Sequence, residues 1–286
     1  MSEKIEIIEC PRDAMQGIKE FISTDLKAEY INSLLKVGFD TIDFGSFVSP
    51  KAIPQLKDTA EVLAKLDLNN TNSKLLAIVA NMRGVEQACS FDEIQYLGYP
   101  FSISETFLAR NINSSIEKSW EALSEIQNTA AKHNKELVVY ISMAFGNPYG
   151  DDWSPDLVAE WTQKLYSELG IKIIALSDTV GSSTTEQIND IFTTALASAN
   201  NDLNIGAHLH TTPADAELKV KALLDAGCKR IDVALGGFGG CPMAKEDLTG
   251  NMPTEALVKV LNERNLLTLD KLRLNEAQLI MNKVFN

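Results

Sequence analysis

The sequence alternates between short β-rich runs and helical runs from one end to the other. Most β-rich runs consist of Ile, Val and Leu with little polar alternation, as expected of parallel strands covered on both faces. There are eight of them: Ile5–Cys10, Thr41–Phe47, Leu75–Ala80, Glu93–Leu97, Leu137–Ala144, Lys172–Asp178, Asn204–His210 and Arg230–Leu235. Eight strand–helix units without a linker, repeat or low-complexity insert predict an α/β fold, a (β/α)8 TIM barrel.

Start and stop signals bound the helical runs between these strands. Serines stand where N-caps are expected, before runs that reach Val37, the region of His133 and Leu169: Ser23, Ser115 and Ser154. Ser114–Glu117 resembles a capping box, and Pro155 occupies a first helical position. Glycines that can end a helix before the next strand follow three runs: Gly38, Gly170 and Gly227.

We expect a single catalytic TIM-barrel domain over residues 1–286, with a C-terminal helical extension at Thr254–Asn262 and Asn275–Phe285. The alternative is a doubly wound sheet, which typically has a glycine-rich, phosphate-binding turn after its first strand. The turn reads Cys10-Pro11-Arg12-Asp13 instead, which favours the barrel.

Charge and composition narrow the class of partner. The 286 residues carry a net charge of −13, spread along the chain, which disfavours nucleic acid because phosphate binding needs a basic face. A phosphorylated small molecule needs only a few local cations and stays possible. No apolar run approaches a membrane span, and the N-terminus enters a strand at once, so we expect no membrane association and no signal peptide. The four cysteines lack Cys-x-x-Cys spacing, which predicts a reducing, cytoplasmic location.

Polar side chains gather at the carboxyl ends of the predicted strands, where barrel enzymes carry their chemistry. Polar loops alone would not explain why strands of buried type end in Asp, His and Arg. The residues at these ends are Arg12, Asp13, Asp43, Ser46, Ser142, Asp178, Thr179, His208 and His210.

His208 and His210 are two of only three histidines in the chain and stand two apart on a predicted strand. Residues two apart on a strand share a face, so both imidazoles can reach one small cation. The alternative is a pair of polar residues on a sheet face with no ligand. With Asp13 and Asn251 they would offer two imidazole nitrogens, a carboxylate and an amide oxygen, a set that suits Mg²⁺ or Mn²⁺.

A glycine-dense run, Gly236–Gly240, follows the last strand and predicts a mobile lid over the barrel mouth. Cys241 lies at its tip and could enter the closed site as an acid or base. The alternative for Cys241 is a small apolar loop residue, but its place between two glycine-rich stretches favours the chemical role.

Several segments together resemble the hydroxymethylglutaryl-CoA lyases, which belong to the DRE-TIM metallolyases. The resemblance runs in register over nearly the whole chain and is carried by Pro11–Gln16, Ser46–Lys51, Ser177–Gly181, His208–His210, Gly236–Pro242 and Gly250–Asn251. It implies a divalent cation, an acyl-CoA substrate, and cleavage of 3-hydroxy-3-methylglutaryl-CoA to acetyl-CoA and acetoacetate, as in leucine degradation or ketone-body formation. It also implies a homodimer or a higher homo-oligomer.

The resemblance assigns roles position by position. It makes Asp13, His208, His210 and Asn251 the metal ligands, Arg12 the cation that steadies the thioester enolate, and Cys241 the acid that protonates it. His208 or Asp13 would be the general base. Asp43 stands where the family usually has Glu, and three residues fall on other active-site positions: Gln16, Asp178 and Glu255. Lys19 aligns with a lysine near the CoA phosphates, although an exposed lysine beside a helix is the alternative.

The chain departs from the family pattern at several places. The first motif is one residue shorter than Glu-x-Gly-Pro-Arg-Asp-Gly, and Ala14 follows Asp13. Thr211 replaces a common aspartate and Asn147 a common cysteine. The segment Gly98–Glu105 is longer and more aromatic than usual, so we expect a loop at the barrel mouth that could reshape the acyl pocket.

These departures leave other activities open. The chain could act on a related 3-hydroxyacyl-CoA, or be a Claisen synthase or a pyruvate-releasing aldolase. Synthases generally carry a further regulatory portion, and the aldolases lack the glycine–cysteine lid. A barrel that binds CoA esters without catalysis is disfavoured by the complete set of ligands and acid.

Overall fold

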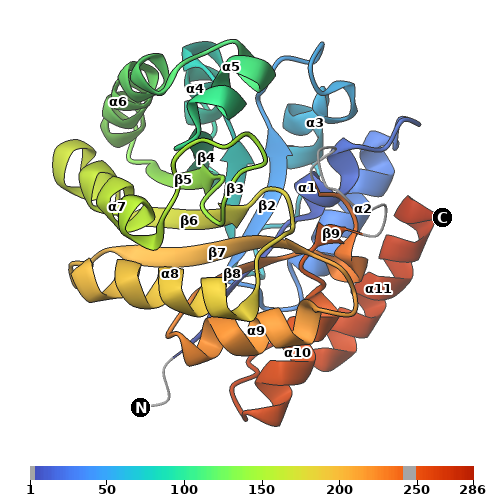
Figure 1. Ribbon diagram of the computed structural model, residues 1–286. Coiled ribbons are helices and arrows are strands. Elements are labelled where there is room, and N and C mark those ends of the chain that lie inside the picture. Colours follow the sequence, from blue (N-terminus) through green and yellow to red (C-terminus); the bar gives the residue numbers. More distant parts are fainter. Residues whose placement is uncertain (1–3, 241–248) are drawn as a thin grey trace.

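Eight parallel strands close into a ring in the computed structural model, which describes residues 4–240 and 249–286 (Figure 1). The ring is closed because β6 pairs with β7 and β1 pairs with β8, and this confirms the predicted (β/α)8 barrel. The strands are β1 (Glu6–Glu9), β2 (Thr41–Ser46), β3 (Lys74–Ile78), β4 (Ile94–Ser102), β5 (Glu136–Ser142), β6 (Ile173–Asp178), β7 (Asn204–Thr211) and β8 (Arg230–Val233). A short ninth strand, β9 (Gly250–Asn251), pairs antiparallel with β7.

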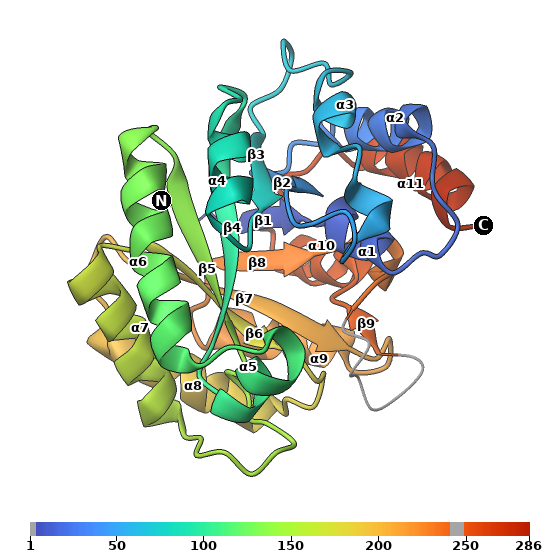
Figure 2. The ribbon, with the colours of Figure 1, turned by 90° about the horizontal axis from the view of Figure 1, so that it is seen from above.

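Helices cover the outside of the ring (Figure 2). They are α1 (Pro11–Gln16), α2 (Thr24–Leu34), α3 (Thr59–Leu63), α4 (Met82–Cys89), α5 (Glu105–Ile112), α6 (Ile116–Lys132), α7 (Pro155–Leu169), α8 (Thr185–Ser198), α9 (Ala216–Asp225), α10 (Thr254–Glu263) and α11 (Lys271–Phe285). The main apolar core fills the space between these helices and the outer faces of the strands. No helix of the described ranges is long and apolar enough to cross a membrane.

The predicted helix caps are confirmed with small corrections. Ser23, Ser115 and Ser154 each accept a backbone N–H at a helix N-terminus. The capping box predicted at Ser114–Glu117 is wrong, since the third helical residue there is Lys118; a reciprocal box forms instead at Thr184 and Gln187. Gly170 ends α7 in a left-handed conformation, with φ of 68°.

The two closing helices occur where the sequence predicts them. The first ends one residue later than expected, at Glu263, while α11 begins at Lys271, because Asp270 caps its N-terminus. The second helix packs against α2, where Lys283 pairs with Glu29 at 2.9 Å and the ring of Phe285 meets that of Tyr30. The C-terminal extension therefore joins the end of the chain to its beginning.

The segment Gly98–Glu105 is not the loop that the sequence predicts. Strand β4 continues to Ser102 and pairs with β5 from Tyr96 to Ser102, and α5 begins at Glu105. Pro100 is tolerated in this strand because pairing with β3 ends earlier, where Gly98 accepts a bond from Val79 at 2.9 Å. The backbone nitrogen of Pro100, which has no hydrogen, faces the β3 side of the strand, beyond the bond between Val79 and Gly98. No hydrogen bond between the strands is therefore lost.

The interior of the ring is divided between an apolar half and a charged half. A separate apolar cluster comes from strands on one side: Leu76, Ile78, Val138, Tyr140, Ile173 and Ala175. Buried charged side chains come from β1, β2, β7 and β8 and the residues that follow them: Arg12, Asp13, Asp43, His210, Arg230 and Asp232. Because β3, which contributes Leu76 and Ile78, lies across the ring from β7, the chemistry of the charged half faces an apolar wall.

Candidate active site

The short helix α1 delivers Arg12 and Asp13 to the barrel mouth directly after β1. The sequence predicts a turn here, but Pro11 starts a helix because its fixed φ suits the first helical position. Arg12 Nη1 donates to Asp13 Oδ1 at 2.8 Å and to Gln16 Oε1 at 2.9 Å. The guanidinium also binds the carboxylate of Asp43, through Nε at 3.0 and 3.1 Å. Arg12 is thus held from three sides by groups that leave its orientation fixed.

Strand β7 delivers both histidines to the same face, as the alternation predicts. His208 Nε2 lies 3.8 Å from Asp13 Oδ2, and ligand atoms of Asp13, His208 and His210 all lie within 4.8 Å of one another. His210 Nδ1 lies 3.1 Å from the carbonyl oxygen of Thr179. Its other nitrogen, Nε2, is buried and has no hydrogen-bond partner among the described residues.

Strand β9 brings Asn251 to the same place. In the antiparallel pair with β7, Asn251 stands directly opposite His210. The Asn251 amide nitrogen donates to the carbonyl oxygen of Phe238 at 2.8 Å. The four residues predicted as metal ligands are therefore brought together, although they come from the two ends of the chain.

The electrostatics of this cluster suit a bound cation. Burial raises the pKa of Asp13, but Arg12 and both imidazoles outweigh it and bring the pKa down to about 2. Burial and the neighbouring His208 lower the pKa of His210, which favours the neutral ring. An ionised carboxylate and a neutral imidazole are the forms that bind metal.

The donor set fits Mg²⁺ or Mn²⁺. An orphaned imidazole nitrogen, buried beside a carboxylate and a second imidazole, loses hydrogen-bonding free energy unless a ligand occupies the space it faces. The side chain of Asn251 adds an amide to the cluster of Asp13, His208 and His210. Among the described residues, no cysteine belongs to that cluster. Asp13, His208, His210 and Asn251 could thus hold one hard divalent ion with positions left for substrate oxygens.

A cavity of about 380 Å³ opens above these residues. Its polar lining comes mainly from Arg12, Asp13, Gln16, Ser142, Ser177, Thr179, His208 and His210. Its apolar lining comes from Val48, Ile53, Ile78, Ala80, Pro100, Ile112 and Tyr140. Gln16, which the sequence places at the active site, lines the cavity and bonds both Arg12 and Asp13. Pro100 lies within the segment expected to shape the acyl pocket, and Ile112 ends the helix α5 that follows it.

Asp43 lies behind Arg12 rather than in the cavity. Its side chain is fully buried and binds the guanidinium. Burial raises the pKa of Asp43 to about 6, although the charge of Arg12 opposes this. The position of Asp43 therefore fits a residue that orients Arg12, rather than one that touches substrate.

Asp178 does not reach the cavity either. Strand alternation turns its neighbours Ser177 and Thr179 inward and Asp178 outward. Its carboxylate accepts backbone N–H groups of residues 181–183 at 2.9 to 3.1 Å, and Lys219 Nζ lies 3.3 Å away. The sequence indicates that Asp178 stands at the strand end, but not that it organises the loop.

Glu255 and Lys19 also lie away from the cavity lining. The carboxylate of Glu255 accepts the backbone N–H of Gly236 at 3.1 and 3.2 Å, and thereby fixes the start of the glycine run. Lys19 is exposed. A lysine there can meet a ligand only outside the barrel.

The described part of the glycine run packs tightly on the candidate ligands. Gly239 has φ of 84°, and a Cβ at this position would stand 2.5 Å from the carbonyl oxygen of Asp13. Gly240 lines the cavity. Only glycine permits this approach. The expected mobility of the run stays a prediction, and Cys241 lies outside the described residues.

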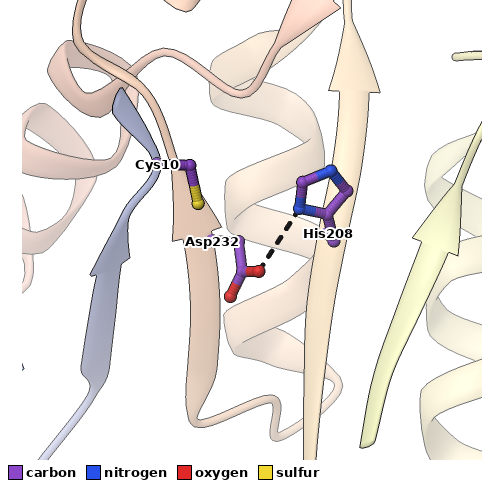
Figure 3. Close-up of side chains that lie close together, drawn as sticks. All are labelled: Cys10, His208 and Asp232. Atoms are coloured by element: carbon purple, nitrogen blue, oxygen red, sulfur yellow. Dashed lines mark hydrogen bonds and ion pairs between the residues drawn. The ribbon is translucent and has the colours of Figure 1, made fainter. Parts of the chain in front are cut away.

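Sequence reasoning missed two charged residues below the histidines, Asp232 and Arg230. Asp232 on β8 is the register partner of His208 on β7, and its Oδ2 lies 3.3 Å from His208 Nδ1 (Figure 3). Arg230 Nη1 donates to the other carboxylate oxygen of Asp232 at 2.8 Å. The sequence did contain a sign of this pair. Two charged residues that stand two apart on a strand of buried type share a face, and that face must be the interior of the ring.

Comparison with known proteins identifies the family of this chain. Residues 4–282 match the HMGL-like family. The cytoplasmic 3-hydroxy-3-methylglutaryl-CoA lyase of Rattus norvegicus is 35% identical over 274 residues, which span 94% of this chain and 77% of that protein. The crystal structure of hydroxymethylglutaryl-CoA lyase from Pseudomonas aeruginosa superposes with a TM-score of 0.91 at 30% identity, covering 99% of this chain and 94% of that one.

A further similar structure carries ligands. It is an HMG-CoA lyase from Acinetobacter baumannii in complex with coenzyme A and 3-methylmalate, with a TM-score of 0.89, 29% identity and coverage of 99% and 92%. With a family match over most of the chain and relatives above 30% identity, this chain belongs to the HMGL-like family and is an enzyme of the lyase class.

Proposed function

We propose that this enzyme, acting as one catalytic domain, cleaves 3-hydroxy-3-methylglutaryl-CoA to acetyl-CoA and acetoacetate by retro-Claisen chemistry. The observation that carries the proposal is the convergence of Asp13, His208 and His210, with an orphaned His210 Nε2, at the floor of a cavity that also holds Arg12. The lyases to which the chain is similar, one of them bound to coenzyme A, support an acyl-CoA substrate.

The proposed cofactor is Mg²⁺ or Mn²⁺, held by Asp13, His208, His210 and Asn251. When bound, such an ion acidifies a hydroxyl and polarises a carbonyl or carboxylate oxygen. The pKa of Asp13, about 2, keeps this carboxylate ionised throughout the neutral range.

The proposed reaction begins with loss of the proton of the C3 hydroxyl to His208 or Asp13. The bond between C2 and C3 then breaks, its electron pair passes to the thioester as an enolate, and the C3 oxygen becomes the ketone of acetoacetate. Arg12 stabilises the enolate oxygen, since it is a buried cation whose orientation is already fixed by Asp43 and Gln16. A proton from the thiol of Cys241 to C2 completes acetyl-CoA.

The apolar half of the cavity would exclude water from the enolate. Ile78 on β3 and Pro100 on β4 lie across the ring from the ligand-bearing strand β7, and the ring of Tyr140 packs edge-on against that of His208, with 5.5 Å between ring centroids. Premature protonation by solvent is then disfavoured, and the proton comes from a positioned acid.

The experiment supplies 3-hydroxy-3-methylglutaryl-CoA with Mn²⁺ or Mg²⁺ and measures acetoacetate and acetyl-CoA. Equimolar formation of both products, abolished by a chelator and restored by the metal, is expected. Absence of both products with either metal would overturn the proposed substrate.

A further inference from the structure

We propose that Asp232 is a positioning residue that fixes the tautomer of His208, and that Arg230 fixes the orientation of Asp232. The inference rests on the proposed metal site. It concerns which nitrogen of His208 carries hydrogen and which presents a lone pair to the proposed cation.

The register of β7 and β8 brings the two side chains together. His208 and Asp232 are direct partners in this parallel pair, so their side chains rise side by side inside the ring. His208 Nδ1 lies 3.3 Å from Asp232 Oδ2, while Nε2 faces Asp13. An ionised carboxylate can only accept, so Nδ1 carries the hydrogen. In the neutral ring, Nε2 is then the nitrogen with the free lone pair.

Asp232 and its partner Arg230 are both buried. The carboxylate is 2% exposed and Arg230 is 3% exposed, so water does not compete for either group. Asp232 Oδ1 accepts from Arg230 Nη1 at 2.8 Å, which leaves Oδ2 for His208. Cys10 shares this cluster, but its thiol points to the carbonyl oxygen of Ile8 at 3.8 Å, and Figure 3 shows it beside the pair rather than between them.

Replacing Asp232 by asparagine removes its charge and keeps its shape. In Asp232→Asn, one oxygen and one NH2 group replace two equivalent oxygens. Buried Arg230 is a charged donor that cannot accept, so it takes the oxygen, and the NH2 group is turned toward His208 Nδ1. The imidazole must then accept at Nδ1 and carry its hydrogen on Nε2. This is the tautomer that cannot bind a cation at Nε2.

The test compares Mn²⁺ affinity, measured by electron paramagnetic resonance, in three variants. Asp232→Asn should weaken Mn²⁺ binding by about 10- to 100-fold, the range for groups that orient a metal-bound histidine. The double variant Arg230→Met with Asp232→Asn should recover a large part of that loss, because the freed amide can turn its oxygen to His208. A merely structural role predicts the opposite, since the second substitution removes another buried contact.

Asp58→Asn is the matched control. Asp58 is also a buried carboxylate, with Oδ1 2.7 Å from Lys27 Nζ and Oδ2 2.8 Å from Thr24 Oγ1. This variant should lose stability yet bind Mn²⁺ with wild-type affinity. Unchanged Mn²⁺ affinity in Asp232→Asn, or no recovery in the double variant, would overturn the inference. Failure of the wild type to bind Mn²⁺ would instead remove the proposed metal site.

A second measurement does not depend on whether a variant folds. The chain has only three histidines, so ¹⁵N-histidine labelling of the wild type gives few, assignable ring signals. At about pH 9, where an ordinary imidazole is neutral, the metal-free protein should show His208 protonated at Nδ1 and bare at Nε2. A ring protonated at Nε2 alone would overturn the inference.

Discussion

Asn251 lies directly opposite His210 in the antiparallel pair formed by β9 and β7. This two-residue strand is what joins the late part of the chain to the histidines, and Met252 N extends the contact by donating to Leu209 O at 3.0 Å. Where β9 sits therefore decides whether an amide can share a cation with the imidazoles.

We predict that Gly250→Ala weakens metal binding without altering any ligand. A Cβ at Gly250 would stand 2.1 Å from the carbonyl oxygen of Gly237, so β9 must move and carry Asn251 with it. The Mn²⁺ dissociation constant should rise by about tenfold or more, or ~1.4 kcal/mol. Gly17→Ala is the matched control, because a Cβ there meets nothing within 4 Å. Equal affinities in the two variants would contradict this account of β9.

Arg12→Lys should lower kcat by about 100-fold or more, the usual cost of removing one preorganised donor at a developing oxyanion. Lysine keeps the charge but cannot bind Asp43, Asp13 and Gln16 in the fixed arrangement of the guanidinium. Steady-state rates at saturating metal give the answer. A variant that keeps kcat within a few-fold of the wild type would show that Arg12 is not the enolate partner.

Cys241→Ala should lose most turnover while substrate still binds, because a proton donor is removed and the binding cavity is not. Rates and the affinity for the CoA ester are measured separately. Cys89→Ala, a buried cysteine on α4, serves as control. Intact turnover in Cys241→Ala would exclude this thiol from the chemistry.

We predict that the buried carboxyl group of Glu9 makes the free energy of unfolding fall as pH rises. It is fully buried and accepts bonds from Leu235 N and Thr254 Oγ1 at 2.7 and 2.6 Å. Burial raises its pKa from 4.5 to about 8, despite those two bonds. Between these values the unfolded chain releases the proton and the folded chain keeps it, so the free energy of unfolding decreases as pH rises and levels off above about 8.

Chemical denaturation from pH 5 to about 9 tests this, with Glu9→Gln as the comparison. The glutamine variant should lack this contribution, and the difference between the two proteins should shrink or reverse as pH rises. Parallel curves for both proteins would show that Glu9 does not hold its proton in the folded state.

The order and type of the strands were predictable because parallel strands covered on both faces leave a plain apolar signature. β4 was the exception, since its end contains Gly98 and Pro100, which normally mark a loop. Only the pairing partners decide that a proline fits there. A single sequence does not show that the pairing of β3 with β4 ends at Gly98, before the proline.

The histidine pair was predictable because strand alternation places residues two apart on one face. Asp178 and Glu255 were harder, since a side chain at a strand end can turn inward or bind the next loop. That choice depends on the path of the loop, which the sequence leaves open. Asp232 was missed because its strand was taken as apolar, although charge inside a barrel strand is itself a sign of a buried polar network.

The direct test of one ion shared by Asp13, His208, His210 and Asn251 is anomalous diffraction at the manganese edge from crystals soaked in MnCl₂. One strong peak within bonding distance of these four side chains is expected, and it should vanish in His210→Ala but persist in His133→Ala. A peak elsewhere, or none in a protein that still cleaves 3-hydroxy-3-methylglutaryl-CoA, would contradict the proposed metal site.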